Sequence, residues 1–98
     1  MVSEDCIYLK SDDSQIWLDY GTRGQLRDFY LYENNELILQ SHFTFFKGHL
    51  CVSGKGLISW PYEKNDECSI KINGKVFGIN KDDIKQSELF DELLEHIF

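Results

Sequence analysis

One uninterrupted segment, Leu37–Phe46, constrains the fold of this chain more than any other feature of the sequence. The segment is rich in β-branched and aromatic residues and contains neither glycine nor proline, which favours a long central strand. Side chains alternate between the two faces of a strand, so the segment is predicted to have one mainly apolar face. This apolar face consists of Leu37, Leu39, Phe43 and Phe45. The chain is therefore expected to build a β-sheet around this segment.

Short connections on both sides of this segment predict that its neighbours pair with it as antiparallel strands. Leu26–Tyr32 precedes it across residues 33–36, and Leu50–Ser53 follows it across residues 47–49. Both connections have the length and the residue types of hairpin turns, in which asparagine and glycine accept unusual backbone angles. Another hairpin is predicted near the N-terminus, from the alternating runs Cys6–Lys10 and Gln15–Tyr20.

The residues that follow predict a short strand, an exposed loop and a further hairpin. Leu57–Trp60 reads as a strand that Pro61 is expected to end or to place at an edge of the sheet, because proline lacks the N–H that a sheet needs. The polar residues 63–67 are predicted to form an exposed loop. Asn73-Gly74 is the strongest turn signal, because this dipeptide accepts the positive φ angles of a type I′ turn. That turn places four residues on one buried face, namely Ile70, Ile72, Phe77 and Ile79.

The C-terminal residues Glu88–Ile97 predict an amphipathic helix. Apolar residues at helical spacing form one stripe, made of Leu89, Phe90, Leu93, Leu94 and Ile97. Acidic residues lie between them and form a carboxylate stripe, made of Glu88, Asp91, Glu92 and Glu95. Strands first and one helix last predict a single α+β domain over residues 1–98, with a mainly antiparallel sheet of six to eight strands. These strands are expected in hairpins and a meander, as a sandwich or a partly closed barrel, with the helix packed on the sheet.

The charge of the chain limits the partners that it can bind. Its 17 acidic and 10 basic residues give a net charge of −7, and the acids concentrate near both ends of the sequence. This balance argues against binding nucleic acid or an anionic membrane, and it favours a basic protein partner. The acidic N-terminus lacks the features of a signal peptide, and 3 cysteines without a disulfide spacing are typical of a reducing compartment. We therefore expect a cytoplasmic protein.

No residue pattern in the sequence indicates catalysis or a bound cofactor. His42, His49 and Cys51 resemble a metal site at first, but they lack the usual ligand spacing and a fourth ligand. Cys51 is more simply explained as a small core residue. There is no nucleophile motif and no phosphate-binding loop before a helix. We therefore predict no catalytic residue, no metal site and no cofactor, and a function in binding rather than as an enzyme.

Two groups of residues are candidates for a partner-binding surface. The acids of the carboxylate stripe repel one another and approach a helix C-terminus, where the helix dipole favours cations. Such a stripe either attracts a basic partner or is an ordinary solvated face. Tyr30 and Tyr32 share a strand face with Asp28, and tyrosine beside a carboxylate is typical of protein-binding hot spots. The alternative is that a sandwich or barrel buries these tyrosines.

The leading hypothesis is a non-catalytic acidic binding module, an inhibitor or immunity-type protein that neutralises a basic toxin or enzyme by occluding its surface. Nucleic-acid-processing enzymes are suitable targets, because their surfaces are basic. One alternative is a barrel-like module for a small ligand or lipid, with an apolar cavity lined by Trp17, Phe43 and Phe45. Another is a homo-oligomeric structural subunit that buries its tyrosine face on itself.

Overall fold

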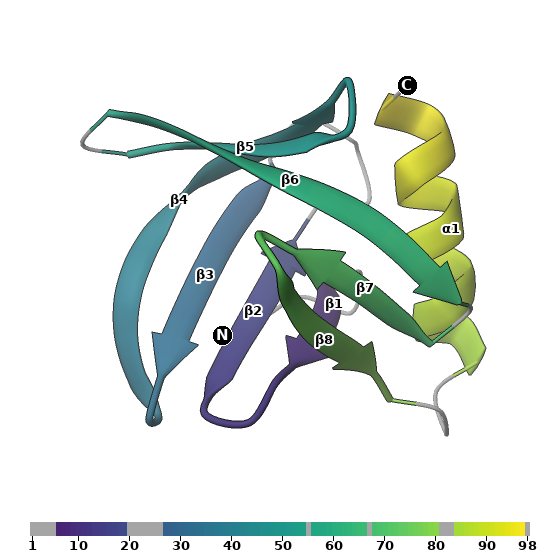
Figure 1. The fold of residues 1–98 in the computed structure, drawn as a ribbon, viewed down its shortest axis with the longest axis horizontal. Helices are drawn as coiled ribbons and strands as arrows, with labels where there is room; N and C mark the ends of the chain where they lie inside the picture. Colours follow the sequence, from purple (N-terminus) through teal and green to yellow (C-terminus); the bar gives the residue numbers. More distant parts are fainter. Residues whose placement is uncertain (1–5, 20–26, 55, 67, 81–83, 98) are drawn as a thin grey trace.

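Eight antiparallel strands of the described chain follow one another around a closed barrel, and a helix follows the last strand (Figure 1). The computed structural model describes residues 6–19, 27–54, 56–66, 68–80 and 84–97, with the side chains of residues 84, 96 and 97 left aside. The elements are β1 (Cys6–Lys10), β2 (Ser14–Asp19), β3 (Asp28–Glu33), β4 (Glu36–Phe46), β5 (His49–Ser53), β6 (Leu57–Asp66), β7 (Ser69–Ile72), β8 (Lys75–Ile79) and α1 (Ile84–Ile97). The predicted α+β class, with an antiparallel sheet and one C-terminal helix, is confirmed.

Two-residue turns connect several of the strands, and their residues have the expected backbone angles. Positive φ angles occur at Asn34, Asn35, Lys47, Gly48, Asn73 and Gly74. These are the three predicted hairpin turns, and positive φ at both central positions defines the type I′ geometry. Because each two-residue turn sets the pairing of its strands, the face formed by Ile70, Ile72, Phe77 and Ile79 is buried as predicted. The predicted first hairpin also forms, while Tyr20 and Leu26 lie outside the described residues.

The central strand β4 pairs with both predicted neighbours but departs from its predicted alternation at one end. Phe43 and Phe45 are buried, as expected. Leu37 is 44% exposed, however, so its predicted place on the same face as Phe43 and Phe45 is wrong. The register with β3 shifts where Leu31 pairs with Leu39 but Tyr32 pairs with Leu37, which leaves one extra residue in β4. This β-bulge turns Leu37 to the outer face, beside Tyr32.

Strand β6 overturns the prediction of a short strand followed by an exposed loop. It runs without interruption through Pro61, and residues 57–61 pair with β5 while residues 62–66 pair with β7. The pairing with β7 begins only at Tyr62, and the Pro61 carbonyl accepts the Asn73 N–H at 2.7 Å. Proline therefore stands where the strand exchanges one neighbour for the other, a place where the ladder with β7 needs no donor.

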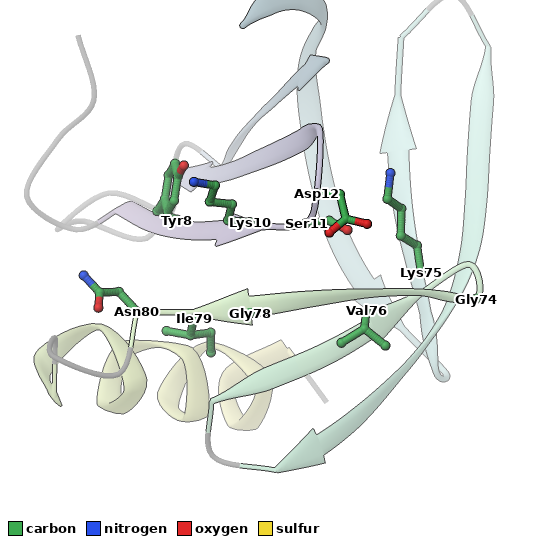
Figure 2. A pocket seen from close by; sticks show the side chains of 10 residues that line it. All are labelled: Tyr8, Lys10, Ser11, Asp12, Gly74, Lys75, Val76, Gly78, Ile79 and Asn80. Carbon is green, nitrogen blue, oxygen red and sulfur yellow. The ribbon is translucent and has the colours of Figure 1, made fainter. Parts of the chain in front are cut away.

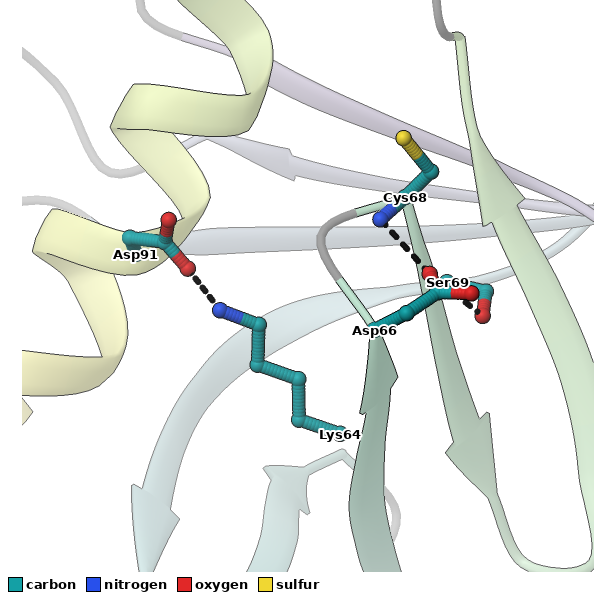
Figure 3. Close-up of polar contacts among 5 residues, drawn as sticks. All are labelled: Lys64, Asp66, Cys68, Ser69 and Asp91. Atoms are coloured by element: carbon teal, nitrogen blue, oxygen red, sulfur yellow. Dashed lines mark hydrogen bonds and ion pairs between the residues drawn. The ribbon is translucent and has the colours of Figure 1, made fainter.

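The polar end of β6 closes into a tight turn instead of a loop. The Asp66 carboxylate accepts the backbone N–H of Cys68 at 2.7 Å and the hydroxyl of Ser69 at 3.1 Å (Figure 3). Short acidic side chains favour turns because they can bond in this way to backbone groups that follow them. Pairing with β7 holds residues 63–66 in the strand, although their polar side chains had indicated a loop.

The helix covers one end of the barrel, which we call the closed mouth. It packs against β1 and β4, which are not neighbours in the barrel, so it crosses the end of the barrel instead of following one wall. Figure 1 shows α1 beside the end of β6. Phe90 is fully buried and Leu93 is 2% exposed, and both belong to the barrel core. Leu89 and Leu94 pack against that core, which confirms the described part of the predicted apolar stripe.

The same helix repairs a gap in the wall of the barrel. Strand β1 pairs with β8 only through Leu9 and Lys10, so the backbone of Tyr8 has no strand partner on that side in the described chain. The buried side chain of Gln86 takes this place. Its amide oxygen accepts the Tyr8 N–H at 3.2 Å, and its amide nitrogen donates to the Tyr8 carbonyl at 2.9 Å. One glutamine thus supplies both hydrogen bonds that a neighbouring strand would have supplied.

Candidate functional site

Three aromatic side chains form a continuous row on the outer wall of the barrel. In the strand register, Tyr8 of β1 lies opposite Trp17 of β2, and Trp17 lies opposite Tyr30 of β3. Their neighbours along each strand fill the barrel interior, so these three rings face outward. The Tyr8 and Trp17 rings meet edge to face with centroids 4.4 Å apart. All three side chains are half-buried, which leaves a rigid and partly exposed aromatic surface.

An acidic row runs parallel to the aromatic row, one step nearer the closed mouth. Asp19 of β2 lies opposite Asp28 of β3, and Asp28 lies opposite His42 of β4. The Nδ1 atom of His42 lies 3.2 Å from a carboxylate oxygen of Asp28. Directly opposed carboxylates are by themselves unfavourable in a sheet, and here His42 stands beside one of the two. We call the two rows together the aromatic–acidic wall, which consists of Tyr8, Trp17, Tyr30, Asp19 and Asp28.

Tyr30 links the two rows electrostatically. Burial raises the pKa of Tyr30 above its ordinary value of 10.0, and the neighbouring carboxylates of Asp28 and Asp19 raise it further. Both effects oppose the charged phenolate, because a second negative charge near carboxylates and away from water is unfavourable. The Tyr30 hydroxyl therefore remains protonated and can donate a hydrogen bond across the whole neutral pH range.

Of the residues that the sequence singled out, the structure places Asp28 and Tyr30 in this wall and Tyr32 at its border. Tyr32 is half-buried on the same outer face, where it lies opposite Gln15 and the exposed Leu37. Sequence reasoning missed Asp19 and the contribution of Tyr8 and Trp17. Alternation in the first hairpin shows that Tyr8 and Trp17 face each other. Their register with Tyr30 depends on pairing across residues 20–27, which no local pattern specifies.

The carboxylate stripe lies elsewhere, on α1 at the closed mouth. Asp91 forms an ion pair with Lys64 of β6, which ties the helix to the barrel (Figure 3). Glu88 and Glu95 are exposed to solvent. Figure 1 shows α1 and β3 well apart. The predicted partner-binding residues thus divide into a wall group and a helix group.

A wide groove follows the seam between β1 and β8. Within the described chain, the two strands pair only at Leu9 with Ile79 and at Lys10 with Gly78, and the groove beside this short pairing has a volume of about 1050 Å³. Figure 2 shows Tyr8 and Lys10 of β1 on one side of this seam, and Ile79 and Asn80 on the other. Lys10 and Lys75 both line the groove, so its charge differs from that of the neighbouring wall. The aromatic–acidic wall therefore ends at Tyr8.

The residues that the sequence suggested as metal ligands or as the lining of a cavity have different surroundings in the structure. His42 is on the outer wall, while the Nδ1 atom of His49 lies 3.2 Å from the Lys47 carbonyl. In the part of the chain that the structure describes, three metal-ligating side chains do not cluster anywhere. The predicted cavity between Trp17, Phe43 and Phe45 is wrong, because Trp17 faces outward and the two phenylalanines are packed core residues.

Comparison of the chain with protein-family models, with curated proteins and with solved structures finds no match. Within the described residues, no helix has both the length and the apolar character that crossing a membrane requires.

Proposed function

We propose that this protein is a non-catalytic acidic binding module that occludes a basic surface of another protein, in the manner of an inhibitor or immunity protein. The observation that carries this proposal is the aromatic–acidic wall, in which a row of three half-buried rings stands beside Asp19 and Asp28. Tyrosine and tryptophan dominate binding energy at protein interfaces, and adjacent carboxylates select a basic partner.

The mechanism separates attraction from anchoring. A net charge of −7 draws a basic partner toward the molecule and raises the association rate at low ionic strength. Asp19, Asp28 and the exposed acids of α1 contribute to this attraction. Trp17 and Tyr30 then bury their rings against the partner, which slows dissociation. A basic toxin or a nucleic-acid-processing enzyme in the cytoplasm fits this mechanism, and the free thiols of all 3 cysteines support a reducing compartment.

The first experiment identifies the partner. The immobilised protein captures proteins from a lysate of its source organism at low salt, and a salt gradient releases them. A protein bearing both Trp17→Ala and Tyr30→Ala serves as the paired control, because it keeps the charge but loses the anchors. We expect a basic protein that the unaltered wall retains to moderate salt and that the control retains weakly.

The second experiment measures rates with the captured protein. Asp19→Asn combined with Asp28→Asn should slow association at low salt and lose this effect at high salt. Trp17→Ala should mainly speed dissociation, at a cost of about 2 kcal/mol in binding free energy if the ring is an anchor. A combined Glu88→Gln, Asp91→Asn and Glu92→Gln variant tests the helix group in the same assay.

Several outcomes would contradict the proposal. An acidic partner, or a basic partner whose rates do not respond to either set of wall variants, would remove the wall from the mechanism. A molecular mass that rises with concentration, and that returns to the monomer value in the Trp17→Ala and Tyr30→Ala variant, would instead support a homo-oligomer built on this wall.

A further inference from the structure

A second cavity opens at the end of the barrel opposite the helix, which we call the open mouth. Strand order places the β1–β2, β3–β4 and β7–β8 hairpins at this end, and Figure 1 shows the first two away from α1. The cavity has a volume of about 210 Å³ and enters the barrel between β2, β3, β6, β7 and β8. Its lining includes apolar side chains below and polar ones at the rim.

The floor of this cavity is aromatic and aliphatic. Trp60 points into the barrel, where its ring centroid lies 6.0 Å from that of Phe29, yet the side chain is only half-buried. Leu31 and Phe77 complete the apolar surface around it. An apolar cavity of about 150 Å³ is enough to hold benzene in another protein. A space of about 210 Å³ therefore accommodates one aromatic ring with a short substituent, and it is smaller than the pocket of a drug-sized ligand.

The rim carries two charged side chains, the ammonium of Lys75, which is paired with a carboxylate, and the carboxylate of Glu33, which has no such partner within the described residues. The Lys75 ammonium lies 3.1 Å from an Asp13 carboxylate oxygen and donates to the Ser14 hydroxyl at 2.9 Å. Glu33 lines the cavity and is exposed, and its carboxylate has no hydrogen bond or ion pair to a side chain within the described residues. In the strand register Glu33 lies directly opposite Glu36, a second carboxylate. Opposed like charges are unfavourable in a sheet, and a cation at this rim would relieve the repulsion.

We infer that the open mouth binds a small amphipathic organic cation, namely a primary amine on a short chain attached to one aromatic ring. The ring lies against Trp60 between Leu31 and Phe77, and the ammonium group bonds to the Glu33 carboxylate. An ammonium near the face of a tryptophan also gains from the ring quadrupole. This site is separate from the aromatic–acidic wall and does not depend on the function proposed for that wall.

Phenethylamine is the probe for this site, because it has one ring, a two-carbon chain and an ammonium group. The chain contains 2 tryptophans, so a Trp17→Phe background makes Trp60 the single reporter of the cavity. Saturable change of Trp60 fluorescence with phenethylamine is expected in this background. Glu33→Gln should weaken the affinity about tenfold or more, because it removes a charge-assisted hydrogen bond. Glu95→Gln is the matched control, since it removes an exposed carboxylate at the closed mouth, and it should leave the affinity unchanged.

Two related compounds test the chemical class of the ligand. 3-Phenylpropionate has the same ring with a carboxylate, and we expect it to bind more weakly than phenethylamine. Butylamine has the ammonium group without the ring, and it should also bind more weakly. Equal or tighter binding of either compound, equal affinity in Glu33→Gln, or no saturable response to phenethylamine would each overturn the inference. Thermal unfolding of every variant shows whether the protein being tested is folded.

Discussion

The two mouths of this barrel are built from similar strands but are sealed in different ways. At the closed mouth, Phe90 and Leu93 of α1 are buried in the core, and the Gln86 amide bonds the backbone N–H and carbonyl of Tyr8. At the open mouth, hairpin turns leave Trp60 half-exposed in the floor of a cavity of about 210 Å³. An eight-stranded barrel has an interior just wide enough for side chains or one small ligand. A single helix is thus enough to make one end a packed core and leave the other end free to bind.

The closed mouth also differs from the open mouth and the aromatic–acidic wall in how deeply its side chains are buried. Where the helix, β1 and β4 meet, α1 contributes the buried side chains of Phe90 and Leu93 to the core. The aromatic–acidic wall holds half-buried rings and partly buried carboxylates, and the open mouth holds the exposed carboxylate of Glu33. In the wall that we propose as a binding surface, Asp19 lies directly opposite Asp28, and Asp28 has His42 on its other side.

The largest expected effect comes from removing the main side chain that the helix contributes to the core. Phe90→Ala should lower the free energy of unfolding by about 3–5 kcal/mol, because the side chain is fully buried and leaves a cavity. Urea denaturation measures this change. Leu57→Ala is the control at a side chain that is 77% exposed, and its effect should stay within about 0.5 kcal/mol. Similar values for the two variants would show that α1 does not seal the barrel.

A further prediction concerns Gln86, whose side chain bonds the Tyr8 backbone where, among the described residues, β8 does not pair with β1. Gln86→Ala should lower the free energy of unfolding by about 1–3 kcal/mol, because it leaves the Tyr8 N–H and carbonyl without partners. Hydrogen exchange of the Tyr8 amide should become faster at the same time. Lys85→Ala, at the exposed neighbouring position, controls for altered helix propensity. Unchanged protection of the Tyr8 amide would contradict the bridging role.

A matched pair of leucines compares the two mouths directly. Leu93→Ala at the closed mouth should cost about 2–5 kcal/mol, because this side chain is 2% exposed. Leu31→Ala at the open mouth should cost about 1 kcal/mol, since its side chain is only partly buried and borders a cavity. Urea denaturation of both variants gives the difference. Equal costs would mean that the open mouth is packed as tightly as the closed one.

The smallest expected effect concerns the ion pair at the rim of the open mouth. Hydrogen bonding and charge attraction from Lys75 hold the pKa of Asp13 below its ordinary value of 3.8. A depressed carboxyl pKa stabilises the folded protein above the unfolded pKa, and this contribution disappears as the pH falls below about 4 through the folded pKa. Lys75→Met should return the pKa of Asp13 toward 3.8 in an NMR titration. An unchanged Asp13 titration would show that the two residues are not paired in solution.

Local patterns in the sequence predicted much of this fold, because turns and alternation act over a few residues. The Asn73-Gly74 turn set the register of β7 and β8, and the described part of the apolar stripe of α1 packs on the core as expected. The predictions were wrong where the pairing between strands mattered more than the residue types within a segment. Pro61 was expected to end β6 or to place it at an edge, but it stands where the strand changes neighbours. Leu37 was expected on the same face as Phe43 and Phe45, but a β-bulge turns it outward.

The candidate sites show the same limit. Asp28, Tyr30 and Tyr32 were recognisable from one strand, because alternation places them on one face. Their partners on β1 and β2 were not, because register between strands joined by residues 20–27 has no local signal. The cavity at Trp60 brings together residues from five strands, and the sequence placed Trp60 at the end of a short strand instead.

The sequence by itself determined the class of the fold, the hairpin turns, the amphipathic helix and the net charge of −7, since each follows from residue type and short spacing. Tertiary structure alone decided that the sheet closes, that α1 seals only one end, and which side chains meet on the outer wall. The barrel closes by pairing β1 with β8, which are far apart in the sequence. The Gln86 side chain then bonds the Tyr8 backbone, with which β8 does not pair in the described chain. These are long-range pairings, whose free energy depends on every strand between them.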